Sequence, residues 1–471
     1  MRRRSFLHNM LWLTSGLLAS CSKTFSVAKG SKSLLKGKVT AGGKGIKGAV
    51  ISDGFSVVQT SNNGGYELTL TPQSEHVFVS VPSGYHFPQE AGLARHYAVV
   101  QESVSEINFE LQKLDVDDNK HQFIIWADPQ VRNASDVSKL MSQSVPDVQQ
   151  FIKAQPAGTL LHGITVGDIV WDVHNLFADY NNAVAQCGIP FFQVLGNHDM
   201  DYNKGGDEMS DKGFKTAYGP SYYSFNRGQV HYVVMDDVLY LGSDRNYKGS
   251  ITQQQLDWLQ KDLSFVSKDK LVVLCVHIPL HNGVDNRQAL LDIVKDYKVH
   301  IMSGHTHHNR NVIAGNVYEH VHGTLCGAWW TGPVCEDGTP SGYGIYEVDG
   351  AELKWQYKSV GHPLDHQLST QVYTSDAGVK EVQANVWNWD KDWKVEWWAD
   401  DVYKGTVANV NNFDPQTITL YKGTELPKGR PFVEPKKTDH LFPVTVPDGA
   451  KQIKFAATDR FGKKYLAIAH V

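Results

Sequence analysis

The chain has 471 residues, enough for about three domains of ordinary size. Hydrophobic residues make up 41% and charged residues 20%, values typical of a globular protein that argue against a disordered, collagen-like or coiled-coil chain. The net charge is -5 and the basic residues are spread thinly, which argues against binding to duplex nucleic acid. Histidine is frequent, with 21 residues, and its clustering indicates metal binding.

Residues 1–21 have the pattern of a lipoprotein-type signal peptide. A basic stretch precedes an apolar run that is too short to span a bilayer. The sequence LASC at 18–21 resembles the lipobox of bacterial lipoproteins, which implies a lipid anchor at Cys21 and a membrane-anchored, periplasm-facing protein. An ordinary signal peptide that happens to contain a cysteine is the alternative. The run RRSFLH at 3–8 also resembles a twin-arginine export signal, with general secretion as its alternative.

Residues 22–34 are expected to be a linker, and 35–112 are expected to form an N-terminal β-sandwich. Tyr66, Leu68 and Leu70 alternate with polar residues, as in a half-buried strand, and Asn63-Gly64 is typical of a hairpin turn. The segment 37–54 resembles the carboxypeptidase-regulatory-like accessory domains of exported bacterial proteins, which implies a supporting role.

Residues 118–360 are predicted to form a layered α/β domain, because apolar strands alternate with helical stretches. Thr252 and Gln255 have the spacing of a capping box at the start of a helix. Strands are expected at 122–127, 159–166, 190–195, 230–236, 270–276 and 299–303, and helices at 136–154, 174–186, 252–265 and 286–297.

Residues 366–471 return to alternating patterns and predict a C-terminal β-sandwich. Its tryptophans are expected to pack in a core or between domains, in preference to forming a carbohydrate platform. They are Trp387, Trp389, Trp393, Trp397 and Trp398.

Four cysteines follow Cys21. Cys326 and Cys335 lie nine residues apart in a glycine-rich stretch, and in an oxidising compartment a disulfide and two free thiols are equally expected. Cys275 lies in an apolar run and is expected to be a small core residue.

Five polar clusters each follow one of the expected strands, where open α/β sheets bind their ligands. They are ADPQ at 127–130, GDIVWD at 167–172, GNHD at 196–199, His277, and GHTH at 304–307. Their carboxylates, amides and imidazoles suit Mn, Fe, Zn or Co. They outnumber the ligands of one four-coordinate ion, which predicts two metals bridged by Asp168. Such a pair activates water for attack on phosphorus, so the clusters indicate phosphoester hydrolysis.

In this order within 128–307, the clusters resemble the motifs of the calcineurin-like metallophosphoesterases: D-x-H, G-D, G-N-H-(D/E), H and G-H-x-H. The flanking β-domains and the sequence DGTPSGY at 337–343 resemble a bacterial subgroup with dedicated N-terminal and C-terminal domains. The resemblance implies a four-layer α/β/β/α catalytic domain. It also implies hydrolysis of phosphate mono- or diesters by hydroxide activated at two metal ions, with Mn, Fe or Zn expected.

The same resemblance implies a role for each motif residue. Asp128 and His307 correspond to ligands of the first metal, and Asp168 to the bridge. His198 corresponds to a general acid or transition-state stabiliser, and Asp199 is expected to hold its imidazole charged and oriented. The ligands expected for the second metal are Asn197, His277 and His305.

Two positions depart from the family pattern. Gln130 stands where the family usually has histidine, and we favour it as a ligand of the first metal through its amide oxygen. The alternatives are contact with substrate or with a metal-bound water, or a weak first site. Asp172 falls one residue later than the usual second aspartate, so it either caps the following helix or orients a neighbouring group.

A rival interpretation is an envelope-anchored binding protein with a degraded metal site, for which Gln130 is the only sequence support. Within the enzyme interpretation, Arg132 and Arg310 near the motifs favour a phosphate monoester, whereas Trp171 and Trp330 favour a diester. Membrane anchoring would bring substrates of the cell envelope close to the site.

Overall fold

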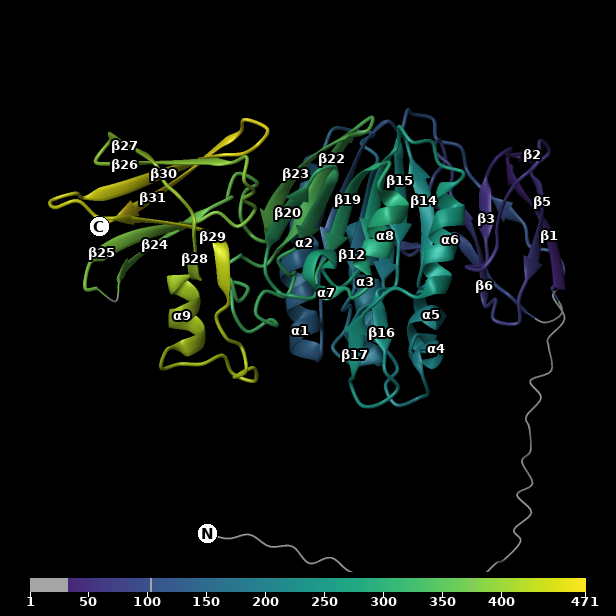
Figure 1. Ribbon diagram of the computed structural model, residues 1–471, viewed down its shortest axis with the longest axis horizontal. Helices are drawn as coiled ribbons and strands as arrows, with labels where there is room; N and C mark the ends of the chain where they lie inside the picture. The colour runs from purple at the N-terminus through teal and green to yellow at the C-terminus, as the bar shows by residue number, and fades with distance from the viewer. Residues whose placement is uncertain (1–32, 102–103, 376) are drawn as a thin grey trace, which may run out of the picture.

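The computed structural model describes residues 33–101, 104–375 and 377–471. The predicted signal peptide, Cys21 and most of the predicted linker lie outside the described residues. In the described part of the chain, no helix is both long enough and apolar enough to cross a membrane. A central α/β domain lies between an N-terminal and a C-terminal β-domain, in a row (Figure 1).

The N-terminal domain contains two four-stranded sheets. Tyr66, Leu68 and Leu70 are buried on β5 while the residues between them are exposed, which confirms the predicted alternation. The turn at Asn63-Gly64 does not close a hairpin, because β4 pairs with β3 and β5 pairs with β1 in the other sheet. The strands are β1 (Ser33–Ala41), β2 (Lys44–Gly45), β3 (Val50–Ser52), β4 (Val57–Gln59), β5 (Gly65–Leu70), β6 (His76–Ser80), β9 (Tyr97–Val99) and β10 (Phe109–Glu110).

One segment of this N-terminal region belongs to the sheet of the central domain. The two short strands β7 (Gln89–Glu90) and β8 (Leu93–Ala94) pair with each other, and Leu93 of β8 pairs in parallel with Phe191 of β13. The predicted N-terminal domain therefore also adds an edge strand to the central sheet. The two domains share one continuous hydrophobic core.

The central domain is built on two sheets packed face to face. The first has the order β23-β22-β11-β12-β13-β8-β7 and the second β14-β15-β18-β19-β21-β20. The first contains β11 (Lys120–Trp126), β12 (Leu161–Val166), β13 (Phe191–Val194), β22 (Gly342–Asp349) and β23 (Glu352–Ser359). The second contains β14 (Tyr223–Arg227), β15 (Val230–Val234), β18 (Leu271–Cys275), β19 (Lys298–Ser303), β20 (Arg310–Ala314) and β21 (Val317–Val321). Each of the six predicted strands overlaps one of these.

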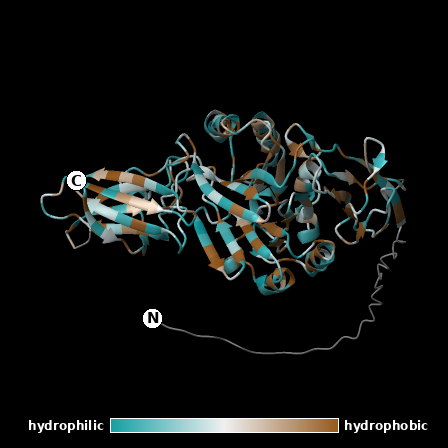
Figure 2. Ribbon diagram, turned by 90° about the horizontal axis from the view of Figure 1, so that it is seen from above, coloured by the Kyte–Doolittle hydropathy of each residue, from teal (hydrophilic) through white to brown (hydrophobic). Residues whose placement is uncertain are grey.

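Helices cover both outer faces of the paired sheets, which gives the predicted α/β/β/α layers (Figure 2). Thr252 caps α6 by accepting a hydrogen bond from the amide of Gln255, as its spacing predicts. The predicted helix 136–154 is interrupted by a π-helical turn at Leu140–Ser144. The helices and the remaining hairpin are α1 (Ala134–Lys139), α2 (Val145–Lys153), α3 (Phe177–Cys187), α4 (Asp207–Ser210), α5 (Lys212–Tyr218), α6 (Gln253–Leu263), α7 (Leu280–Gly283), α8 (Arg287–Val294), β16 (Val238–Tyr240) and β17 (Tyr247–Gly249).

The C-terminal domain consists of two four-stranded sheets around a separate core. Trp387 and Trp393 are buried, and Trp389 and Trp397 pack partly buried against that core, which confirms packing as the role of these four rings. The elements are β24 (Ser369–Thr374), β25 (Lys380–Asn385), β26 (Lys394–Ala399), β27 (Val402–Thr406), β28 (Val410–Phe413), α9 (Pro415–Lys422), β29 (Lys437–Thr445), β30 (Gln452–Thr458) and β31 (Lys464–His470).

The cysteines of the described residues are all free thiols. Cys326 and Cys335 are both buried near the hydroxyl of Thr324 and form no disulfide with each other. Cys275 is buried in β18, as predicted.

Aromatic rings and histidines fill the space between the two central sheets. His162 on β12 is buried, and neither ring nitrogen has a hydrogen-bond partner among the described residues. His121 on β11 is also buried, but its ring nitrogens lie 2.9 Å from the carbonyl oxygen of Asp118 and 2.7 Å from the hydroxyl of Tyr232. The rings around His162 are Phe87, Phe123, Phe192, Phe225 and Tyr232.

This contrast in hydrogen bonding predicts that two matched substitutions differ in their effect on stability at pH 7. Burial holds the pKa of His162 well below its usual value. When the pH falls below about 6.5, His162 is therefore protonated in the unfolded chain but stays neutral in the folded chain, which favours unfolding. His162→Phe should therefore make the free energy of unfolding less sensitive to acid, by about 1.4 kcal/mol per pH unit below this pKa. Urea titrations at pH 7 and pH 5 measure this.

His121→Phe is the control, because it leaves the hydroxyl of Tyr232 and the carbonyl of Asp118 without a partner. It should lower the free energy of unfolding at pH 7 by about 1–3 kcal/mol. Equal destabilisation of both variants at pH 7 would contradict the account of His162.

Candidate metal centre

The predicted site residues lie in loops at the carboxyl ends of parallel strands. In the first sheet, Asp128 follows β11, Asp168 follows β12 and Asn197 follows β13. In the second sheet, His277 follows β18 and His305 follows β19. The structure thus brings together residues that are far apart in sequence, because the carboxyl ends of the parallel strands of both sheets lie on the same side of the domain.

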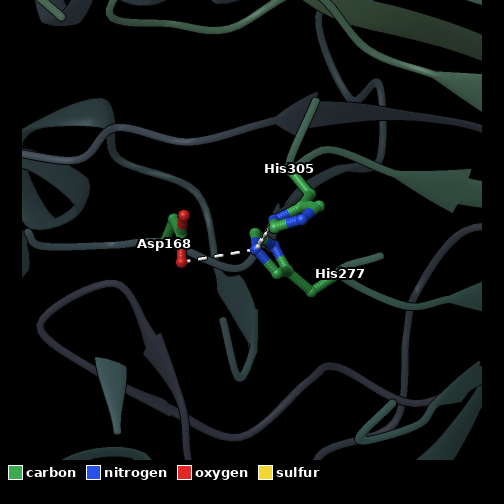
Figure 3. A group of neighbouring side chains, drawn as sticks. All are labelled: Asp168, His277 and His305. Carbon is green, nitrogen blue, oxygen red and sulfur yellow. Dashed lines mark hydrogen bonds and ion pairs between the residues drawn. The ribbon is translucent and has the colours of Figure 1, made fainter. Parts of the chain in front are cut away.

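The residues predicted for the second metal converge on Nε2 of His277. Oδ1 of Asn197 and Nδ1 of His305 each lie 3.1 Å from this nitrogen, and Oδ1 of Asp168 lies 3.3 Å from it. On the other side of the ring, Nδ1 donates to the carbonyl oxygen of Val166, at 2.9 Å. That bond fixes the ring orientation and leaves Nε2 facing the cluster. Asp168, His277 and His305 point toward one another (Figure 3), with ligand atoms within 4.8 Å of one another.

Among the residues predicted for the first metal, Gln130 contacts the other oxygen of Asp168, and His307 lies near Asp128. Gln130 donates from Nε2 to Oδ2 of Asp168, at 3.0 Å, and Nε2 of His307 lies 3.6 Å from Oδ1 of Asp128. Oε1 of Gln130 is buried and has no hydrogen-bond partner in the described part of the chain. Because a buried carbonyl oxygen without a partner is costly, a cation at this position would compensate for it. The donor set fits a second metal ion beside Asp168.

The backbone around the site is strained. Eight of the thirteen non-glycine residues with a left-handed φ in the described ranges lie here. Such a conformation costs about 1–3 kcal/mol per residue and persists where the surrounding structure enforces it, typically at functional sites. The eight are Asp128, Gln130, Asp168, Asp172, His305, His307, Trp329 and Trp330.

Two motif glycines are required because the ligands approach their backbone closely. A Cβ on Gly196 would lie 2.0 Å from the amide nitrogen of Asp168 and 2.4 Å from its Oδ1. A Cβ on Gly304 would lie 2.4 Å from Oδ2 of Asp128. Any larger residue at either position would displace a carboxylate of the site.

Burial and neighbouring charges act in opposite directions on the titrating groups. Burial raises the pKa of Asp128 to about 8 and lowers the pKa of both His305 and His307 to about 3. Burial alone would also lower the pKa of His277, but Asp168 and Asp128 outweigh it and raise this pKa to about 10. Conversely, His277 and His198 overcome the burial of Asp168 and hold its pKa well below its usual value. Asp168 is therefore the permanent negative charge of the site.

His198 is oriented by Asp172, and not by Asp199 as expected. Nδ1 of His198 lies 2.8 Å from Oδ1 of Asp172, and Arg245 pairs with the other oxygen of that carboxylate. Burial alone would lower the pKa of His198, but Asp168, Asp172 and Asp199 raise it, so Asp199 does favour the charged imidazole as expected. Of the two roles left open for Asp172, orientation of a neighbour is the one that the structure shows.

Asp199 has a backbone role in this structure. Its carboxylate accepts hydrogen bonds from the amides of Ile169, Val170 and Gly196, at 3.0–3.2 Å. It thereby joins the loop after β12 to the loop after β13. The physical reason for the difference is that its side chain turns into the protein interior, whereas the imidazole of His198 turns outward.

Two further positioning residues escaped the sequence analysis. The buried carboxylate of Asp237 accepts hydrogen bonds from the amides of His277 and Ile278, at 3.0–3.2 Å. Asp337 accepts one from the amide of Asn309, at 2.8 Å, and pairs with His440 of the C-terminal domain, at 3.0 Å. Asp337 lies in the DGTPSGY segment, whereas Asp237 stands in no recognisable motif.

Comparisons of sequence find three consecutive matches along the chain. The N-terminal domain of calcineurin-like phosphoesterases matches residues 33–114, the calcineurin-like phosphoesterase domain matches 107–309, and the C-terminal domain of calcineurin-like phosphoesterases matches 319–465. Among curated proteins, none matches this chain.

Comparisons of structure find metal-dependent phosphatases among similar folds. A dimetal phosphatase from Danio rerio aligns with 51% of this chain and 96% of its own, at 13% identity and a TM-score of 0.39. A purple acid phosphatase from yellow lupin (Lupinus luteus) seeds aligns with 66% of this chain and 67% of its own, also at 13% identity and a TM-score of 0.39. A putative 5'-nucleotidase from Staphylococcus aureus aligns with 52% and 54%, at 13% identity and a TM-score of 0.34.

The unpartnered amide oxygen predicts the effect of replacing Gln130. Gln130→Ala should weaken binding of one of two metal ions by at least ~10-fold, and Gln130→His, which restores the common family residue, should preserve it. Equilibrium dialysis against manganese with elemental analysis gives the two affinities. The control His308→Ala removes an imidazole next to His307 whose one hydrogen bond within the described ranges is to the carbonyl oxygen of Thr306, and this variant should bind manganese as the wild type does. Unchanged binding in Gln130→Ala would place Gln130 outside the ligand set.

Proposed function

The chain belongs to the calcineurin-like phosphoesterases with dedicated N-terminal and C-terminal domains, and on that basis we propose that it hydrolyses phosphate mono- or diesters at a dinuclear metal centre. The observation that carries the proposal is the convergence of Asp168, Asn197 and His305 on Nε2 of His277, within 3.3 Å, beside His198 held by Asp172. This set combines a place for cations with a positioned proton donor.

In this proposal Asp168 would be the ligand shared by two metal ions, for which Mn, Fe and Zn are the candidates. When bound, the ions supply an acidified water and neutralise charge on the phosphoryl oxygens. The first site is formed by Asp128, Gln130 and His307, and the second by Asn197, His277 and His305.

His198 moves the proton in this proposal. Its Nδ1 is engaged by Asp172, so Nε2 is the atom that delivers a proton to the leaving oxygen of the ester. Its backbone amide donates to Oδ1 of Asp168, at 2.9 Å, which keeps the imidazole next to the ligand cluster. Arg245 pairs with Asp172 and limits the freedom of that carboxylate.

We further propose that the protein works at the cell envelope. The export signal and the LASC sequence at 18–21 support anchoring at Cys21, with the catalytic domain facing the periplasm. A substrate drawn from the envelope follows from that location.

The binding-protein alternative requires a degraded site. Against it stand the contacts of the motif residues: Asp168, Asn197 and His305 lie within 3.3 Å of Nε2 of His277. The buried Gln130 also still offers an amide oxygen without a hydrogen-bond partner in the described part of the chain.

The proposed function predicts metal-dependent turnover. The full chain with added manganese should hydrolyse p-nitrophenyl phosphate or bis-(p-nitrophenyl) phosphate, and excess chelator should abolish the release of nitrophenol because the water is no longer acidified. The preferred ester distinguishes a monoesterase from a diesterase. Absence of turnover of either ester with Mn, Fe or Zn, in protein shown to bind metal, would favour the binding-protein alternative.

A further prediction distinguishes the role of His198 as proton donor from the role of the metal ligands. His198→Ala should lower kcat by ~10²–10⁴-fold while the protein still binds two metal ions, because the imidazole supplies a proton and no ligand. Asp172→Asn should lower kcat less, since His198 remains but loses its charged partner. Elemental analysis of the same samples provides the check, and loss of metal from His198→Ala would refute the assignment.

A further inference from the structure

Three aromatic side chains from two domains meet beside the metal centre. Trp171 follows the Asp168 motif, Trp329 lies in the loop before β22, and Phe432 lies in the loop between α9 and β29 of the C-terminal domain. The ring centroids are 6.2 Å apart for Trp171 and Trp329, 5.5 Å for Trp171 and Phe432, and 5.2 Å for Trp329 and Phe432. We call these three residues the aromatic cluster.

The aromatic cluster is continuous with the site residues. Trp171 contacts His198 edge to face, with centroids 5.7 Å apart, and Trp329 stacks on His307, at 4.2 Å. A phosphoester whose leaving oxygen reaches His198 therefore has the cluster next to the group that leaves.

An interdomain ion pair holds the loop that carries Phe432. The guanidinium of Arg430 donates to Oδ2 of Asp136 at the start of α1, at 3.0 Å, and both side chains are buried. Phe432 itself is 49% exposed. A fixed aromatic ring that stays half in solvent beside a reactive centre is suited to contact a ligand.

The surrounding charges restrict the chemistry of that ligand. Arg132 and Arg430 lie 4.9 and 5.0 Å from the ring of Trp171 and already occupy cation–π positions there, so this ring is not free to hold a cationic headgroup. A planar ring does not compete with these arginines and gains aromatic contact with Phe432, the half-exposed member of the cluster.

We propose that the aromatic cluster selects phosphoesters whose leaving group carries a planar aromatic or heteroaromatic ring. The inference rests on the proposed function, because it takes the phosphoryl group to bind at the metal centre. The C-terminal domain then supplies a specificity-determining residue, Phe432, to a site whose reactive groups all come from the central domain.

The test is a binding measurement that needs no turnover. Isothermal titration of the manganese-loaded full chain with phenylphosphonate and with cyclohexylphosphonate compares a planar ring with a saturated ring of similar size. The wild type should bind phenylphosphonate more tightly, by about 2- to 10-fold. Phe432→Ala and Phe432→Leu should both reduce this ratio toward one, whereas Phe432→Tyr should keep it.

The control is Leu466→Ala, which removes an apolar side chain, 63% exposed, from β31 of the same domain. It should leave the ratio unchanged. Equal affinities for the two phosphonates in the wild type, undetectable binding of phenylphosphonate, or a preference that survives in Phe432→Ala would each overturn the inference. Tighter binding of phosphocholine than of phenylphosphonate would also overturn it, in favour of a cationic headgroup.

Turnover of the nitrophenyl esters is measured separately on the same samples. A ring preference without turnover would refute the proposed function and keep the aromatic cluster as a binding site. Turnover without a ring preference would refute the cluster alone.

Discussion

The negative charge of Asp168, buried where the two central sheets end, is the constraint on which the site depends. Removing a carboxylate from water costs several kcal/mol unless its surroundings compensate. Compensation comes from both sheets: His277 arrives from the second, while Gln130 and the amide of His198 come from the first. The left-handed backbone of Asp168 and the missing side chain of Gly196 allow these groups to come close enough. These contacts to Asp168 therefore help to hold the two sheets together, in addition to the apolar core between them.

Most of the central domain could be predicted from sequence because its signals are local. Each predicted strand is an apolar run, and each motif stands directly after one. The meeting of Asp128 and Asp168 follows from the parallel pairing of β11 with β12, whereas His277 reaches them only because the second sheet packs against the first. The partner of His198 could not be predicted in this way. Asp172 and Asp199 are both close to His198 in the sequence, and only the fold shows that Asp172 faces the ring while three backbone amides engage Asp199.

The contacts between the domains could not be predicted, for a different reason. Strands of two residues, such as β7 and β8, have no periodicity to detect, so their pairing with β13 leaves no trace in the sequence. The links from His440 to Asp337 and from Arg430 to Asp136 join residues more than 100 positions apart. Likewise, the spacing of Cys326 and Cys335 is compatible with a disulfide, and only the fold shows that they do not form one.

The addition of β8 to the central sheet has a consequence for how the protein is made. During synthesis from the N-terminus, Leu93 leaves the ribosome almost a hundred residues before Phe191. The hairpin of β7 and β8 therefore cannot pair with β13 until the later part of the chain has been made. A fragment that starts at residue 107, where similarity to the catalytic family begins, never receives it. The edge of β13 would then present unpaired amide and carbonyl groups to other chains. Such an edge promotes aggregation by intermolecular strand pairing. The N-terminal region thus covers an edge of the central sheet, and we expect the central domain to be more soluble when it is expressed together with this region.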